Sequence, residues 1–211
     1  MKIFNISFHK TGTTSFHNLM NQSKKKSFHD VDYFCKSIMN FKNDHKNNIV
    51  NNYSNENIDF HPKIKLDKFL SYKHLDNLIG EYDAFSDMPF CYLYEYLDKT
   101  YPESLFIYIV RDDEEWYQSI NNHSKKYTNM RKLIYGYGAA YENKNKYISV
   151  KKTHSNEVTK YFKDKDNFLK VNLHDPFIGE KISNFCKFKK ILSFPKRNIY
   201  KISYSKSPIQ S

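Results

Sequence analysis

The residues of this chain that are best suited to chemistry lie near its start, in the run Lys10, Thr11, Gly12, Thr13, Thr14 and Ser15. A glycine among hydroxyl residues, directly behind the apolar residues 3–8, is typical of a strand that turns tightly into a helix. The backbone N–H groups that open such a helix can bind an anion together with a lysine charge and nearby hydroxyls. The pattern therefore predicts an anion-binding loop.

This loop departs from the Walker pattern G-x-x-x-x-G-K-[ST] of nucleoside triphosphatases. When Gly12 is aligned with the second Walker glycine, Thr13 stands where the lysine belongs, and Phe8 and His9 occupy the end that carries the first glycine. The positive charge comes two residues before the glycine instead, at Lys10. A lysine on the approach to the loop suits one phosphate and its leaving-group oxygen better than a triphosphate with magnesium.

At this loop the sequence resembles the PAPS-dependent sulfotransferases, whose 5'-phosphosulfate loop has a lysine, a small hydroxyl residue, a glycine and then threonines. The resemblance implies a P-loop-like fold and transfer of a sulfuryl group from PAPS to a hydroxyl or amine acceptor, with release of PAP. It also implies that residues 10–15 bind the 5'-phosphosulfate. Lys10 would stabilise the negative charge on the leaving phosphate.

A second charged position follows residues 105–110, a continuous apolar run typical of a central parallel strand. Arg111 ends this run, and Ser119 lies eight residues later in a helix that we expect Asp112 or Asp113 to cap. In the sulfotransferases, an arginine and a serine at this spacing hold the 3'-phosphate of PAPS, so the resemblance assigns that role to Arg111 and Ser119. Because α/β sheets bind ligands beyond the carboxyl ends of their strands, we expect both anion sites at one edge.

The residue that removes the proton of the acceptor is less clearly marked. The resemblance aligns Asp87, in an Asp-Met-Pro run, with the catalytic histidine of cytosolic sulfotransferases. A carboxylate can serve as a general base when its surroundings raise its pKa. Asp87 is also suited to cap the helix that follows it, and His29 and Asp30, after a short strand on the same edge, are the alternative bases.

The elements that must position these residues alternate along the chain. We expect strands at residues 3–8, 27–29, 82–86, 105–110 and 168–173, and helices at 14–22 (capped by Thr13 or Thr14), 66–79, 91–99, from 112 or 113 onward, within 125–163 and at 178–188. This alternation predicts an α/β fold, a three-layer α/β/α sandwich around a mainly parallel sheet. The 211 residues fit one domain over 1–211, with an Asn-rich insert at 42–57 and a basic tail at 196–211.

Composition limits the partners of the protein. A net charge of +11 favours anionic ligands, but the lysines are scattered and no nucleic-acid-binding motif is present, so we expect no nucleic acid partner. Cys35, Cys91 and Cys186 are far apart and predict neither a disulfide framework nor a metal site. No segment has the ~20 apolar residues that span a bilayer, and the first strand leaves no room for a signal peptide, so we expect a soluble cytoplasmic protein.

Two other functions stay open at this point. A P-loop nucleotide or small-molecule kinase needs a lysine directly after the loop glycine, and an inactive relative would bind PAP without catalysis. The C-terminal glycine-rich loop of cytosolic sulfotransferases has no counterpart, and Lys196 and Arg197 are candidates to replace it at the 3'-phosphate. No motif identifies the acceptor, which could be a small molecule, a carbohydrate, a lipid or a protein, and none indicates the oligomeric state.

Overall fold

The computed structural model describes residues 1–30, 70–123, 131, 134–136 and 139–195. The predicted insert at 42–57 and the tail at 196–211, with Lys196 and Arg197, lie outside these residues. In the part of the chain described, parallel strands form one sheet in the order β2-β3-β1-β4-β5. They are β1 (Ile3–Asn5), β2 (Ser27–Phe28), β3 (Ala84–Phe85), β4 (Leu105–Val110) and β5 (Phe168–Asn172).

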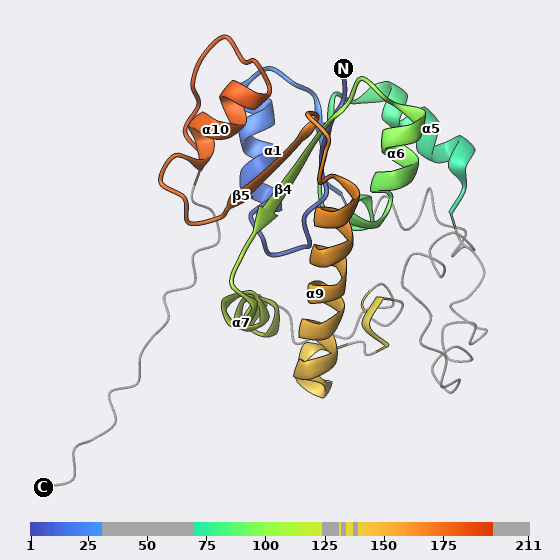
Figure 1. The fold of residues 1–211 in the computed structure, drawn as a ribbon, viewed down its shortest axis with the longest axis vertical. Coiled ribbons are helices and arrows are strands. Elements are labelled where there is room, and N and C mark those ends of the chain that lie inside the picture. The colour runs from blue at the N-terminus through green and yellow to red at the C-terminus, as the bar shows by residue number, and fades with distance from the viewer. Residues whose placement is uncertain (31–69, 124–130, 132–133, 137–138, 196–211) are drawn as a thin grey trace, which may run out of the picture.

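Helices cover both faces of this sheet (Figure 1). One face carries α1 (Thr13–Gln22) and α10 (Ile178–Phe185), and the other carries α5 (Tyr72–Glu81), α6 (Tyr94–Thr100) and α9 (Lys144–Tyr161). The remaining described elements are α7 (Asp113–His123), which follows β4, and the 3-10 turns η1 (Phe90–Tyr92) and η2 (Ala140–Glu142). The predicted three-layer α/β/α fold is confirmed. Of the helices described here, none is both long enough and apolar enough to cross a bilayer.

The central strand β4 shows why an uninterrupted apolar run is needed. Phe106 and Tyr108 pack into the core beneath α6 and α9, whereas Ile107 and Ile109 pack into the core beneath α1 and α10. Successive side chains of a strand point to opposite faces, so a strand covered on both sides requires apolar residues at every position. The predicted bounds of this strand, 105–110, agree with the structure.

Other predicted boundaries differ from the structure. The helix expected at 66–79 is described from Tyr72 to Glu81 and runs through Gly80, where we expected it to end. The first strand was expected to reach residue 8, but its ladder ends at Asn5. Beyond that point the Ser7 hydroxyl accepts a hydrogen bond from Ile109 N at 2.6 Å, so a side chain takes over the pairing as the backbone turns into the loop.

The chain after α10 folds back onto the start of that helix and reaches the loop after β1. A Cβ atom on Gly179 would lie 2.3 Å from the Leu192 carbonyl oxygen and 2.7 Å from Phe194 N. A Cβ atom on Gly12 would lie 2.7 Å from Leu173 Cδ1 and 3.4 Å from Phe194 Cζ. Neither glycine leaves space for a methyl group, so the helix, the returning segment and the loop form one packed unit.

We expect Gly179→Ala to lower the free energy of unfolding by about 1–3 kcal/mol, because the added methyl group meets backbone atoms that cannot move without disturbing the fold. Gly80→Ala is the matched control, since no atom lies within 4 Å of a Cβ at that helical position. It should stabilise the protein by up to about 1 kcal/mol through helix propensity. Chemical denaturation measures both changes, and a Gly179→Ala variant as stable as the wild type would contradict the close packing.

Candidate functional site

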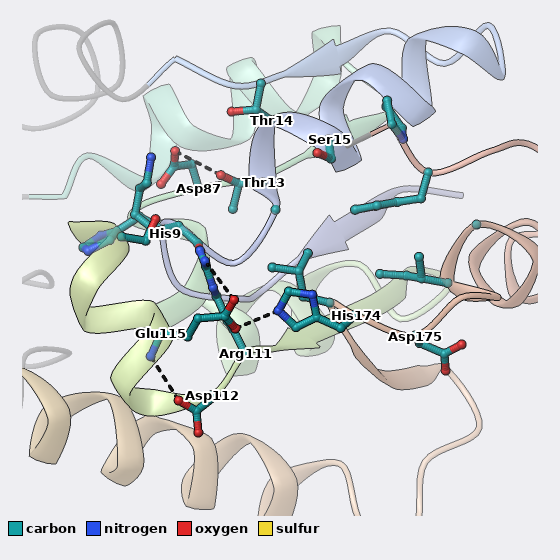
Figure 2. Close-up of a pocket in the computed structure, with 18 of the residues that line it drawn as sticks. His9, Thr13, Thr14, Ser15, Asp87, Arg111, Asp112, Glu115, His174 and Asp175 are labelled. Atoms are coloured by element: carbon teal, nitrogen blue, oxygen red, sulfur yellow. Dashed lines mark hydrogen bonds and ion pairs between the residues drawn. The ribbon is translucent and has the colours of Figure 1, made fainter. Parts of the chain in front are cut away.

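A cleft of about 1440 Å³ opens at the carboxyl edge of the sheet (Figure 2). The turn after every strand contributes to its lining: Lys10 after β1, His29 after β2, Asp87 after β3, Arg111 after β4 and His174 after β5. The carboxyl ends of parallel strands meet at one edge, so side chains from distant parts of the sequence gather there. Lys10 and Arg111 lie at the same edge of the sheet, as we expected from the sequence.

The loop after β1 delivers helix α1 to the cleft through residues with left-handed backbone angles. Lys10 has φ 63° and Gly12 has φ 93°. Gly12 is the N-cap of α1, and no side chain caps the helix, so the prediction that Thr13 or Thr14 would cap it is wrong. The left-handed backbone conformation of Gly12 turns the chain from the loop into α1 without a side-chain cap. The backbone N–H groups of Thr13, Thr14 and Ser15 come before the first intrahelical hydrogen bond, and these residues line the cleft.

The three threonine hydroxyls of the loop have different partners. Thr11 is buried and donates to the backbone carbonyl three residues earlier, at 2.5 Å, so its hydroxyl shapes the loop. The Thr13 hydroxyl donates to Asp87 Oδ2 at 3.5 Å, and the Thr14 hydroxyl lies 3.3 Å from His29 Nε2. The first turn of α1 is therefore tied to the ends of β3 and β2.

Lys10 lies at the cationic end of the cleft. Burial lowers the pKa of its ammonium group below the ordinary value of 10.5; the Asp87 carboxylate acts in the opposite direction, and the positive charges of Arg111 and Arg131 lower the pKa further. Two arginines beside a partly desolvated lysine create an excess of positive potential. A bound anion would relieve it and hold the proton on Lys10.

Arg111 reaches the N-terminal loop from the end of β4. Its Nη1 atom donates to the Lys10 carbonyl oxygen at 2.9 Å, and its Nη2 atom lies 3.5 Å from Glu115 Oε1. The Nε atom is buried and has no hydrogen-bond partner in the part of the chain that is described. The other oxygen of Glu115 forms a 2.7 Å hydrogen bond with His174 Nε2. The guanidinium thus faces the loop, with its Nε donor unused.

The two aspartates after Arg111 have separate structural roles. Asp112 caps α7, because its Oδ1 atom accepts hydrogen bonds from the backbone N–H groups two and three residues later, and these bonds lower its pKa. Asp113 forms an ion pair with Lys151 of α9. Both aspartates therefore use their carboxylates on groups other than the Arg111 guanidinium. Ser119, in the second turn of α7, is buried and lines the same cleft as Arg111.

Asp87 presents one carboxylate oxygen to the loop. Its Oδ1 atom accepts a hydrogen bond from Met88 N at 2.8 Å, whereas Oδ2 lies 3.5 Å from the Thr13 hydroxyl and 3.8 Å from His29 Nε2. The backbone of Asp87 has φ 78°, an uncommon conformation for a residue with a side chain. The N-cap of η1 is Pro89, so the alternative role of Asp87 as a helix cap is wrong.

His29 lies beside Asp87, at the end of β2. Its Nδ1 atom lies 3.0 Å from the Ser86 hydroxyl, which follows β3, and its ring stacks on His17 of α1 at a centroid distance of 5.4 Å. Burial lowers the pKa of His17, and the neighbouring His29 lowers it further. Asp30 is exposed and does not line the cleft. The structure therefore brings Asp87 and His29 together and leaves Asp30 outside.

Some cleft residues were not predicted from the sequence. His174 directly follows the fifth strand, and that position would have indicated it. Glu115 lies one helical turn after Arg111, a spacing at which opposite charges can meet. Residues 191–195 also line the cleft, and their place depends on the packing at Gly179. In the part of the chain described, no three His, Cys, Asp or Glu side chains are grouped as metal ligands would be.

The chain is similar to a known protein family and, over a short stretch, to a fungal protein. The family model described as "Sulfotransferase domain" matches residues 2–137, which is more than half of the chain and includes the loop, Asp87, Arg111 and Ser119. A stretch of 50 residues is 38% identical to "Ava biosynthesis cluster protein M" of Aspergillus versicolor. That stretch covers 24% of this chain and 19% of the fungal protein, so the second similarity is local.

Proposed function

The chain belongs to the sulfotransferase domain family, and we propose that it moves a sulfuryl group from PAPS to a hydroxyl or amine acceptor and releases PAP. Membership of the family supports a sulfotransferase in general, and the proposal adds the donor. The observation that carries it is the 2.9 Å hydrogen bond from Arg111 Nη1 to the Lys10 carbonyl oxygen. This bond brings two cationic positions into one cleft, and PAPS has two anionic ends, the 5'-phosphosulfate and the 3'-phosphate.

The residues of the cleft suit both ends of such a nucleotide. The opening N–H groups of α1 and the Lys10 ammonium favour the 5'-phosphosulfate. The unused Nε donor of Arg111 favours the 3'-phosphate, as does the hydroxyl of Ser119. The cleft exceeds the roughly 300–1,000 Å³ of ordinary small-molecule pockets, so it has room for an acceptor beside the nucleotide.

The proposed chemistry divides between Lys10 and Asp87. The acceptor oxygen or nitrogen bonds to sulfur, and the bond from sulfur to the bridging phosphate oxygen breaks. Lys10 neutralises the charge that develops on this oxygen, with help from the backbone N–H groups at the start of α1. The proton that the acceptor loses goes to Asp87, whose Oδ2 atom faces the loop. His29, 3.8 Å from that oxygen, is the second candidate for the base.

We expect PAP to raise the melting temperature of the protein without added metal, and ATP with Mg²⁺ to raise it much less. A ligand at one hundred times its Kd stabilises the native state by about 2.7 kcal/mol. Differential scanning fluorimetry with PAP, with ATP and Mg²⁺, and with buffer alone compares the three. Stabilisation by Mg²⁺-ATP but not by PAP would favour a P-loop kinase and remove the proposed donor.

Lys10→Ala should lower kcat by a factor on the order of 10² to 10³, the usual loss when one preorganised charge-stabilising donor is removed. The assay follows PAP released from PAPS in the presence of phenol, alcohol and amine acceptors. Lys160→Ala, which removes an exposed lysine from the last turn of α9, is the control for a change in net charge. A wild-type rate for Lys10→Ala would remove Lys10 from the chemistry.

Asp87→Asn should leave the Kd of PAP nearly unchanged and lower kcat by a factor on the order of 10² to 10⁴, because the amide has the same size and can keep the hydrogen bond from Met88 N through its oxygen but accepts no proton. Isothermal titration calorimetry gives the Kd, and the same transfer assay gives kcat. His29→Gln, assayed in parallel, tests the neighbouring candidate. If Asp87→Asn keeps full turnover and His29→Gln does not, the base is His29.

A further inference from the structure

A carboxylate of the chain itself, that of Glu115, forms an ion pair with the Arg111 guanidinium. Glu115 lies in the first turn of α7, and its Oε1 atom is 3.5 Å from Arg111 Nη2. Its Oε2 atom forms the 2.7 Å hydrogen bond with His174, which stands on the turn after β5. Figure 2 shows the Glu115 carboxylate between Arg111 and His174. An anionic group is therefore already present at the edge of the guanidinium that would receive a phosphate.

We propose that Glu115 sets the selectivity of this chain among adenosine nucleotides, because its carboxylate competes with the 3'-phosphate for Arg111. The inference rests on the proposed function, in which Arg111 holds that phosphate. A phosphate monoester carries about −1.5 to −2 charges near pH 7, so it repels a carboxylate at the same guanidinium. A nucleotide without a 3'-phosphate meets no such competition. Glu115 therefore lowers the affinity for the nucleotide with a 3'-phosphate and reduces its advantage over the nucleotide without one.

The surroundings of Glu115 keep its carboxylate ionised, as competition requires. Burial raises the pKa of Glu115, but the hydrogen bond with His174 and the charge of Arg111 outweigh it, so the pKa lies below the ordinary value. The side chains of Arg111 and Glu115 are only 18% and 30% exposed. Charges at this depth are screened less by salt than those of a surface pair.

His174 makes the competition reversible. When an anion takes the Nη2 and Nε atoms of Arg111, Glu115 keeps its hydrogen bond with His174 and needs only to move away from the guanidinium. The contact with Arg111 is the weaker of the two by distance, 3.5 Å against 2.7 Å. Glu115 therefore weakens binding of the 3'-phosphate without abolishing it, and Arg111 keeps its hydrogen bond to the Lys10 carbonyl throughout.

The test compares PAP with adenosine 5'-monophosphate, which lacks the 3'-phosphate, on the wild type and on Glu115→Gln. Glutamine keeps the size and the hydrogen-bonding oxygen of the side chain but removes its charge. We expect Glu115→Gln to tighten PAP binding on the order of tenfold, the scale of removing one like charge at a partly buried site, and to change binding of the monophosphate less than about twofold. Isothermal titration calorimetry at fixed pH and salt measures all four Kd values.

Glu114→Gln is the matched control. Glu114 precedes Glu115 in the same helix turn and also lines the cleft, but its carboxylate pairs with Lys144 at 2.6 Å instead of Arg111. This variant loses the same charge, and its ratio of PAP affinity to monophosphate affinity should stay within about twofold of the wild-type ratio. A Glu114→Gln ratio that rises as much as the Glu115→Gln ratio would show a general charge effect and overturn the competition.

The remaining outcomes separate this inference from the proposed function. If the wild type prefers PAP and Glu115→Gln has the same ratio, the competition is overturned and the proposed function stands. If Glu115→Gln weakens PAP selectively, Glu115 holds Arg111 in place for the phosphate, and the competition is again overturned. If neither the wild type nor the variant distinguishes PAP from the monophosphate, both the inference and the proposed 3'-phosphate site are wrong.

Discussion

The hydrogen bond from the Arg111 guanidinium to the Lys10 carbonyl joins the two halves of the site. Beside it, Trp116 Nε1 donates to the His9 carbonyl at 2.9 Å, so Arg111 after β4 and Trp116 of α7 hold two successive carbonyls of the loop. Lys151 of α9 donates to the Arg111 carbonyl at 2.7 Å. These bonds all involve backbone oxygens, which have little freedom to move. The distance between the loop and the end of β4 is thereby set by the fold, independently of any ligand.

The same cleft combines strong positive charge with carboxylates. Burial lowers the pKa of Lys10, the charges of Arg111 and Arg131 lower it further, and the carboxylates of Asp87 and Glu115 lie near these cations. A cleft with both kinds of charge is neither a simple anion-binding site nor a simple cation-binding site. The proposed sulfuryl transfer would use both kinds of group, because its donor is anionic and its acceptor must give a proton to a base.

The match to the sulfotransferase domain ends at residue 137, yet later elements complete the cleft. Lys151 supports the turn that carries Arg111, His174 binds Glu115, and Phe194 packs against Gly12. The matched segment contains the loop, Asp87 and the end of β4. The later elements complete the surroundings of these matched residues.

The sequence by itself was sufficient for the elements whose cause is local. Residues 105–110 need apolar side chains on both faces, and Gly12 allows the left-handed turn that opens α1, so the strand, the loop and the three-layer fold could be predicted. The spacing from Arg111 to Glu115 allows contact but does not say that His174 shares the carboxylate. Asp87 was a candidate from its alignment alone, and its orientation toward Thr13 depends on how β3 lies beside β1. Contacts between distant segments follow from strand order and helix packing, which no short stretch of residues encodes, and for this reason only the tertiary structure decided them.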